Sequence, residues 1–470
     1  MLRHGGRSAA LGALLAASGC ASTSDGPMQP SECLAPSVSV VAVAPNQTNV
    51  LSVFVTGNAR NADSVMVRFA TVAGDRDSTP ATTAAGDSVV VPVLGLFPAT
   101  DYAAQLVAFN RCGVAESHAV PFTTAALPSD LPSYIGNGSG PSPGYVVFAA
   151  GKYGLVIDNT GRVVWYHKFT NGPGLNFQAQ PNGRFAARPP NATGEVGTWV
   201  EIAPDGNVTR TLGCAHDFPP RMHDLIAEPD GSYWLLCDET RTRDLSAQGA
   251  SQQARVMGTD VQHRSSAGDL LFEWSPFDHF SVDLSVLDSV DRSGAVINWT
   301  HGNALDLDND GNLLVSFRNL SEVDKIDTRS GAVVWRMGGT HNELAFVNSA
   351  VPAFVHQHGL RADGRGRILL LDNLGDPRGS HAERYQIDES EMTAGLSASY
   401  GSPAGILARI GGSAQALPNG HTLVSFGNGN GVEEYDAAGN VVWRLEGNTG
   451  YVFRAQRIRS LYRPGVGDPR

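Results

Sequence analysis

The chain is 470 residues long with 53 Gly and 27 Pro, and only 17% of its residues are charged, against about 25% in an average globular protein. This excess of turn-forming residues argues against a helical protein, and a hydrophobic content of 42% argues against disorder. The formal net charge is −12 and no run of basic residues occurs, so we expect neither nucleic acid nor an anionic membrane surface as a partner. The lysines Lys152, Lys168 and Lys325 all lie outside any P-loop pattern, so no nucleotide-phosphate site is expected.

The first residues have the form of an export signal. Arg3 and Arg7 precede an apolar run at residues 9–17, which is too short to stay in a bilayer as a spanning helix. The run ends in Ala17-Ser18-Gly19-Cys20, which resembles a bacterial lipobox with cleavage before Cys20. We therefore predict a lipoprotein signal peptide over residues 1–19 and a lipid on Cys20 that anchors the protein. The alternative is an ordinary secretory signal followed by an unrelated Cys.

The signal also predicts the cellular location of the protein. Ala21 rather than Asp follows Cys20, which by resemblance favours the outer membrane, with the protein on its periplasmic face or at the cell surface. Four further cysteines would then lie in an oxidising compartment, and they allow three pairings. The pairs Cys33–Cys112 and Cys214–Cys237 each stay within one predicted domain, so we favour these two disulfides.

A β-sandwich is predicted in the N-terminal part of the chain. Residues 20–34 are small and polar and form a tether, after which residues 35–127 contain short alternating strands such as 50–55 and 65–69. The stretches 94–102, 108–110 and 122–124 resemble a fibronectin type III domain, and the length of the segment suits such a sandwich. A linker is then predicted over residues 128–143 from Pro128, Pro132, Pro141 and Pro143.

Two sequence elements repeat between residues 144 and 470. One is a Gly-x-Val-Val-Trp pattern or a variant of it, and the other is a Gly-containing turn ahead of a strand. The first starts at Gly161, Gly206, Gly268, Gly331 and Gly439, with a degenerate copy near Gly395, and the second ends at Gly183, Gly231, Gly311, Gly366 and Gly420. This period suits four short strands per unit and predicts an all-β chain in which the sandwich precedes a six-bladed β-propeller. Pairing of a strand near residues 145–148 with C-terminal strands would close the ring, and two packed sandwiches are the alternative.

Three polar residues occupy one equivalent position in successive repeats. The residue eight positions before the turn glycine is His223, Asn303 or His358 in three consecutive units. His301 lies two residues before Asn303, which places both on one face if the segment is a strand. Because the first strand of each propeller blade lines the central channel, we expect these side chains to converge there, with Arg318 near the end of the following strand. The structural alternatives are hydrogen-bonded loop histidines, a capping role for Asn303, and an ion pair of Arg318 with Glu322 or Asp324.

These residues resemble the bacterial arylsulfotransferase family. The resemblance extends in order over most of residues 144–465. It rests on Met222-His223-Asp224, His301-Gly302-Asn303-Ala304, Ser316-Phe317-Arg318, Gln357-His358, Trp335-Arg336-Met337-Gly338-Gly339, Leu371-Asp372-Asn373 and the run 412–420. The family fold that it implies is a six-bladed propeller behind an N-terminal β-sandwich.

The resemblance implies transfer of a sulfuryl group from a phenolic sulfate ester to a phenol without the nucleotide donor PAPS, and without a cofactor or a metal. His358 would attack sulfur and form a transient sulfohistidine, while His223 and His301 would stabilise sulfuryl oxygens and move protons. Asn303, as a substrate-binding residue, and Arg318 would hold the developing negative charge. The partners would be small phenolic molecules, with membrane contact through the lipid alone, and a homodimer is left open.

One departure from the family pattern and two competing functions bear on this interpretation. Family members often carry Tyr-Arg-Ala where this chain has Phe453-Arg454-Ala455, so a hydroxyl that could contact substrate is lost. In a metal-dependent propeller lyase or hydrolase, the three histidines would instead ligate a divalent cation. A non-catalytic envelope scaffold would be expected to show exposed apolar patches at the blade edges.

Overall fold

The computed structural model describes residues 33–191, 197–287, 292–348, 353–364, 366–447 and 450–470. Over these residues the fold is all-β, as the composition predicts. Helix is confined there to α1 (Pro276–His279) and to two 3-10 turns, η1 (Ser246–Gln248) and η2 (Arg318–Leu320). In the described part of the chain, no helix is long and apolar enough to cross a bilayer. The predicted signal peptide and Cys20 lie outside the described residues.

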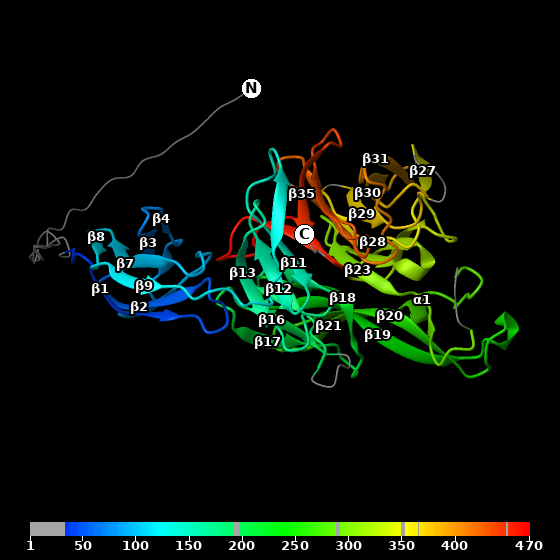
Figure 1. Cartoon of the computed structure of the whole chain (residues 1–470). Coiled ribbons are helices and arrows are strands. Elements are labelled where there is room, and N and C mark those ends of the chain that lie inside the picture. Colours follow the sequence, from blue (N-terminus) through cyan, green and yellow to red (C-terminus); the bar gives the residue numbers. More distant parts are fainter. Residues whose placement is uncertain (1–32, 192–196, 288–291, 349–352, 365, 448–449) are drawn as a thin grey trace, which may run out of the picture.

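The N-terminal part consists of two antiparallel sheets around one apolar core. Their orders are β1-β2-β6 and β4-β3-β7-β8, with β5 and β9 paired to β3 and β7. The strands are β1 (Ser37–Pro45), β2 (Val53–Arg60), β3 (Ser64–Thr71), β4 (Arg76–Ser78), β5 (Thr82–Thr83), β6 (Ser88–Val93), β7 (Asp101–Asn110), β8 (Gly113–Glu116) and β9 (Val120–Thr123). Every second residue of β2 is buried, because a strand between core and solvent alternates its side chains. Figure 1 shows this part in blue at one end of the molecule.

Both expected disulfides are present in the structure. Cys33 is bonded to Cys112, which ties the start of the described chain to the turn between β7 and β8. Cys214 is bonded to Cys237 in β19 (Tyr233–Arg243). Each pair lies within one of the two predicted domains, and the bonds restrict the unfolded chain more than the folded one.

Six more sheets follow in the described residues, each built on four antiparallel strands. In the first sheet, β36 (Ala455–Ile458) pairs with β11 (Tyr145–Ala150), followed by β12 (Tyr153–Ile157) and β13 (Val163–Lys168). The second sheet has β14 (Phe177–Ala179), β15 (Phe185–Ala187), β16 (Trp199–Ile202) and β17 (Val208–Leu212). The third has β18 (Pro220–Ala227), β19, β20 (Ala254–Arg264) and β21 (Leu270–Trp274).

The remaining three sheets continue the same order along the chain. The fourth has β23 (Gly302–Leu307), β24 (Leu313–Phe317), β25 (Glu322–Ile326) and β26 (Val333–Gly338). The fifth has β28 (His358–Ala362), β29 (Arg367–Asp372), β30 (His381–Asp388) and β31 (Thr393–Gly401). The sixth has β32 (Ser413–Ala416), β33 (Thr422–Ser425), β34 (Val432–Tyr435) and β35 (Val441–Gly447). Two short strands, β22 (Ile297–Asn298) and β27 (Ala345–Val347), add in parallel to β20 and β31.

The two repeated sequence elements are turns of these sheets. Gly231 lies between β18 and β19, the first and second strands of the third sheet, with φ 89°. Gly331 lies between β25 and β26, the third and fourth strands of the fourth sheet, with φ 74°. Glycine adopts this left-handed conformation without the steric cost of a Cβ atom, so the turn between two strands is visible in the sequence as a recurring Gly.

The repeated tryptophans join four of the six sheets to the next one. Trp165 in β13 donates its indole N–H to the Pro204 carbonyl in the turn between β16 and β17, at 2.8 Å. In the corresponding turns of the following sheets, Trp274 in β21 donates to the Gly331 carbonyl and Trp335 in β26 donates to the Glu389 side-chain carboxylate. Trp443 in β35 donates to the Asn159 carbonyl in the first sheet, at 2.9 Å. The last of the six sheets is therefore bonded to the first.

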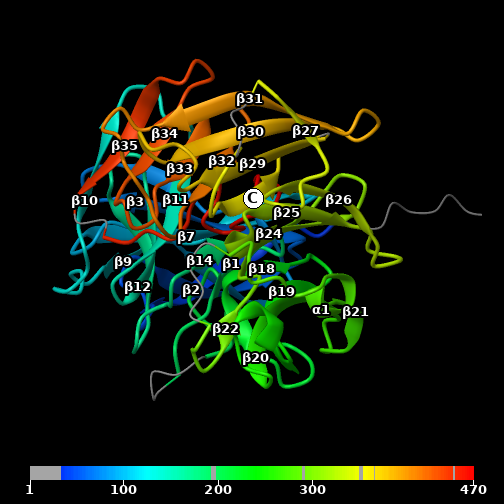
Figure 2. The same cartoon turned by 90° about the vertical axis from the view of Figure 1, so that its right-hand side faces the viewer.

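The strand near residues 145–148 pairs with a C-terminal strand, as the sequence predicts. β11 pairs with β36 in the register Tyr145↔Ile458, so N-terminal and C-terminal strands share one sheet. The first strands of neighbouring sheets are also linked, since Gln178 donates to the Leu225 carbonyl and the Leu305 N–H donates to Asp224. Figure 2 shows the C terminus near the middle of the view, with green strands below it and orange strands above it.

The predicted linker over residues 128–143 is wrong in part. β10 (Tyr134–Gly138) lies within it and pairs with β35 along Tyr134↔Gly447. The segment is therefore the fifth strand of the sixth sheet. The prolines that suggested a linker, such as Pro132 and Pro141, flank this short strand, where the missing backbone N–H interrupts no ladder.

Candidate functional site

The first strands of the third, fourth and fifth sheets bring the predicted histidines together. His223 lies within β18, His301 immediately precedes β23, and His358 begins β28. The imidazole centroids of His223 and His301 are 5.0 Å apart. The ring of Phe453, from the segment before β36, lies 5.7 Å from His223 and 6.2 Å from His358. Phe453 thus stands between two of the histidines, at the position where the family pattern has a Tyr.

The expectation that His301 and Asn303 share the face of one strand is wrong. His301 has φ 50°, a left-handed conformation, and the strand starts only at Gly302. The ring is held from the side of β22, where Asn298 Nδ2 lies 2.6 Å from His301 Nδ1. A backbone turn, and not strand alternation, therefore aims this imidazole at His223.

Hydrogen bonds fix the tautomer of His358. Asn373 follows β29, and its Nδ2 donates to the carbonyls of Ala408 and Gly411 at 2.8 and 2.9 Å. With both amide protons used in this way, Asn373 Oδ1 is an acceptor, and it lies 2.8 Å from His358 Nδ1. The proton of His358 is therefore on Nδ1, and Nε2 carries the free electron pair.

Asn373 was predicted to have no role beyond its place in the motif Leu371-Asp372-Asn373. It comes from the end of a second strand, whereas the repeat alignment compares only first strands. Its role becomes visible only in the structure, where the buried Asn373 follows the strand whose Leu371 is opposite His358 in the ladder.

Asn303 is completely buried and is hydrogen-bonded to the residue before the first strand of the neighbouring fifth sheet. Its Nδ2 donates to the Gln357 carbonyl at 2.7 Å, and its Oδ1 has no partner among the described residues. Gln357 in turn donates to Ser316 Oγ and to the Glu322 carbonyl. The structure therefore gives Asn303 a positioning contact next to His358, with one oxygen left unsatisfied.

All three imidazoles are held neutral. Burial lowers the pKa of His358 to about 4, although the hydrogen bond that His358 donates to Asn373 opposes this shift. Burial and then the charge of Arg221 lower the pKa of His223 and of His301 well below the usual value. Neutral imidazoles at neutral pH can act as nucleophiles and hydrogen-bond donors.

Arg318 reaches the site from the end of β24. It is the first residue of η2, its backbone N–H donates to the His301 carbonyl at 3.1 Å, and its charge helps to lower the pKa of His358. The ion pair considered with Glu322 is made by Arg336 instead, with Arg336 Nη2 2.5 Å from Glu322 Oε2. The position of Arg318 therefore agrees with the expectation of a cation near the histidines.

A buried ionic group lies directly behind the histidines. Asp224, the residue after His223, is completely buried and accepts from Arg361 Nη1 at 2.8 Å. Arg454 Nη2 lies 3.2 Å from the same carboxylate and 3.5 Å from the His223 carbonyl. Two guanidinium groups therefore share the Asp224 carboxylate, which fixes the backbone beside His223.

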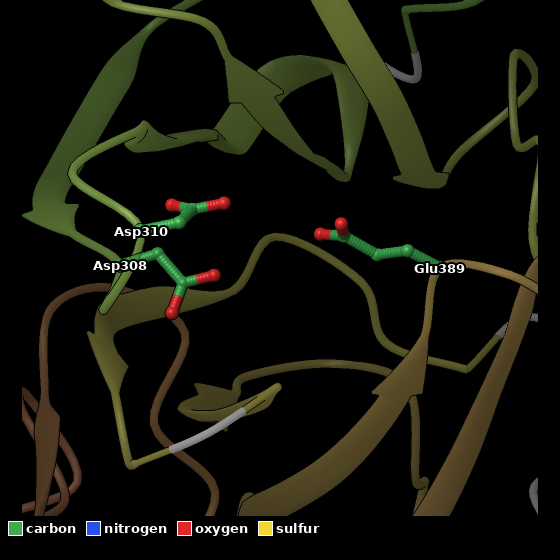
Figure 3. Close-up of side chains that lie close together, drawn as sticks. All are labelled: Asp308, Asp310 and Glu389. Atoms are coloured by element: carbon green, nitrogen blue, oxygen red, sulfur yellow. The ribbon is translucent and has the colours of Figure 1, made fainter. Parts of the chain in front are cut away.

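An acidic cluster elsewhere in the molecule surrounds a lysine. Figure 3 shows the carboxylates of Asp308 and Asp310 facing Glu389, with metal-like spacing. Lys325 Nζ lies 2.9, 2.6 and 2.6 Å from Asp308, Asp310 and Glu389. Lys325 is almost fully buried, and its ammonium lies among the three carboxylates between the fourth and fifth sheets, in the place that a cation would occupy.

Comparisons with known proteins place these residues in a family. The model of the arylsulfotransferase (ASST) family matches residues 214–448. That range contains His223, His301, Asn303, Arg318 and His358. No curated protein matches this chain.

Three solved structures match parts of this chain at low sequence identity. A protein of unknown function from Bacteroides caccae is 14% identical, with TM-score 0.44, over 68% of this chain and 100% of its own. Streptogramin B lyase is 12% identical, with TM-score 0.38, over 67% and 84% of the two chains. Virginiamycin B lyase from Staphylococcus aureus is 10% identical, with TM-score 0.35, over 66% and 87%. The family model matches half of the residues of this chain, and the chain therefore belongs to the arylsulfotransferase family.

Proposed function

We propose that this protein is a PAPS-independent aryl-sulfate sulfotransferase that works by a ping-pong mechanism through a sulfohistidine at His358. The observation that carries the proposal is the hydrogen bond from His358 Nδ1 to Asn373 Oδ1. It leaves Nε2 unprotonated, with a pKa of about 4, in a buried site beside two more imidazoles. A nucleophilic imidazole needs this free electron pair.

In the first half-reaction, the electron pair on His358 Nε2 attacks sulfur as the bond from sulfur to the aryl oxygen breaks. The departing phenolate takes a proton from His223 or His301. Both have a lowered pKa in the empty site, but a bound anionic sulfate favours the protonated imidazole and raises that pKa. Arg318 and the imidazole N–H groups stabilise the charge on the sulfuryl oxygens.

In the second half-reaction, the oxygen of an acceptor phenol attacks sulfur as the bond from nitrogen to sulfur breaks. The phenol proton passes to the same imidazole that gave its proton to the leaving phenolate. His358 returns to its starting form, with its electron pair on Nε2. No net charge or proton is left on the protein after one cycle, so neither a cofactor nor a nucleotide is required.

The test is transfer from an aryl sulfate to a phenol in the absence of nucleotide. We expect the wild-type protein to form the new sulfate ester and His358→Ala to lose at least a thousand-fold in rate, roughly the size of effect seen for other covalent nucleophiles. His118→Ala is the matched control, because His118 is exposed on the N-terminal sheets. Transfer that survives in His358→Ala would contradict the assignment of the nucleophile.

The architecture that supports this chemistry is, we propose, a six-bladed β-propeller over residues 144–470, completed at its edge by β10 and preceded by a fibronectin type III-like domain. The bond from Trp443 to Asn159 and the pairing of β36 with β11 support ring closure.

We further propose that Cys20 carries a lipid that anchors the protein in the bacterial envelope, facing the periplasm or the cell surface. The two disulfides support an oxidising location. Metabolic labelling with a fatty acid, compared with Cys20→Ser, tests the anchor.

A further inference from the structure

A second buried cationic group lies beside the histidines and is not used by the mechanism above. Arg221 lies in β18, two residues before His223, and only 5% of its surface is exposed. Arg188 follows β15 and is 6% exposed. Asp238 in β19 is the carboxylate that faces both, contacting Arg221 directly and interacting electrostatically with Arg188.

Backbone pairing and hydrogen bonds place Arg188 and Arg221 next to the strand that carries His223. Phe177 pairs with Ala187, so Arg188 comes next along the ladder, beside Asn176. Asn176 Nδ2 donates to the His223 carbonyl at 2.8 Å, and the indole of Trp199 donates to the Arg221 carbonyl at 2.9 Å. The charges of Arg188 and Arg221 both act on the imidazole of His223.

The charges of the group do not balance. Two guanidinium groups and one carboxylate leave a net charge of +1 while Asp238 is ionised. Burial raises the pKa of Asp238 and lowers that of Arg188, because each charged form loses its contact with water. The Nε atoms of Arg188 and Arg221 are both buried and have no hydrogen-bond partner within the described parts of the chain. Buried arginines are normally satisfied by an anion.

We propose that Arg188 and Arg221 form a subsite for a second anionic group, and that the preferred substrates are phenols and phenyl sulfates that carry a carboxylate. This inference rests on the proposed sulfotransferase function. The sulfuryl group has its own partners in the three histidines and Arg318. An additional carboxylate on the aromatic ring would fill the positive site beside them, with the planar guanidinium fork as its natural ligand.

Activity with a matched pair of donors tests the subsite. The ratio of kcat/KM for 4-carboxyphenyl sulfate to that for phenyl sulfate is measured in wild type, Arg188→Met, Arg221→Met and Arg188→Lys. Since every variant meets the same two donors, their different leaving groups cancel from the comparison. We expect the ratio to fall about ten- to hundred-fold in the Met variants and to recover in part in Arg188→Lys. Arg255→Met, at an exposed position on β20, is the control and should keep the wild-type ratio.

Binding gives a readout that does not depend on turnover. Titration calorimetry with the His358→Ala protein should show 4-hydroxybenzoate binding at least ten-fold more tightly than phenol, and this preference should weaken with added salt and disappear in the double variant with Arg188→Met. Equal binding of the two phenols, or an unchanged donor ratio in both Met variants, would overturn the subsite. If no aryl sulfate is turned over, the sulfotransferase function fails while the calorimetric comparison still decides the subsite. Thermal unfolding checks that each variant is folded.

Discussion

Asn373 should control the reactivity of His358 although it touches no substrate. Its Oδ1 accepts from Nδ1 of the imidazole at 2.8 Å, and its Nδ2 is fixed by two carbonyls. Asn373→Ala removes the nearer of two acceptors of this N–H and leaves the His356 carbonyl at 3.0 Å, in a site where His358 is 2% exposed. A lost buried hydrogen bond costs about 1.5–3 kcal/mol, so kcat/KM should fall by roughly ten- to hundred-fold.

The variant Asn373→Asp shows whether residue 373 acts on the imidazole of His358 or only supports the local structure. The carboxylate keeps an acceptor for Nδ1 but adds a negative charge beside the imidazole, and this favours the protonated ring. The pKa of His358 should therefore rise from about 4 by roughly one to three units. The acidic limb of the kcat/KM profile would move to higher pH by the same amount.

The assay is a pH series of sulfuryl transfer with wild type and both variants. Asn428→Ala is a matched control, because Asn428 Oδ1 accepts from the Ile410 N–H at 3.1 Å and supports the same loop without contacting His358. An Asn373→Ala variant within two-fold of wild type, or an acidic limb that does not move in Asn373→Asp, would refute the tautomer argument.

Three more outcomes follow from the structure. The wild-type kcat/KM should stay high down to about pH 4–5 before it falls, because His358 must be unprotonated and its pKa is about 4; an acidic limb at pH 6.5 would contradict the buried nucleophile. Burial raises the pKa of Asp260 to about 8, so its stabilising contribution is complete below the unfolded pKa near 4 and is lost as the pH rises towards 8. Asp260→Asn should therefore gain stability over wild type by up to about 1.4 kcal/mol per pH unit in that window, measured by urea unfolding at pH 5 and pH 7, and a pH-independent difference would show that Asp260 is ionised. Trp443→Phe should lower the free energy of unfolding by about 1–3 kcal/mol, since it leaves the Asn159 carbonyl without its indole donor, whereas Trp443→Phe with wild-type stability would show that this bond does not help to hold the first and last sheets together.

Local patterns in the sequence predicted the β-sheet architecture well. The Gly turns and the strand-end Trp residues recur because each repeat needs the same contact. Gly231 supplies a positive φ, and Trp165 supplies an indole bond to the next sheet. The period of the repeat then placed His223, Asn303 and His358 on the first strands of consecutive sheets. The pairing of β11 with β36 was predictable for the same reason, because a ring of repeats needs a closing partner.

Contacts that depend on exceptions to the repeat were not predictable. His301 lies outside any strand, and its own left-handed backbone conformation directs its imidazole towards His223. The strand β10 extends the sixth sheet from within a proline-rich stretch. Asn373 and Arg188 come from the ends of second strands, which the comparison of first strands does not sample. Their roles depend on hydrogen bonds and charges between sheets, and these become visible only once the sheets are packed.

The central claim is that sulfur is bonded to His358 during the reaction. The most direct measurement is mass spectrometry of the protein after incubation with an aryl sulfate and no acceptor, followed by peptide mapping. We predict one added sulfuryl group on the peptide that contains His358, released when a phenol is added and missing in His358→Ala. Consumption of the aryl sulfate with no adduct, or with an adduct on a different residue, would contradict the proposed mechanism.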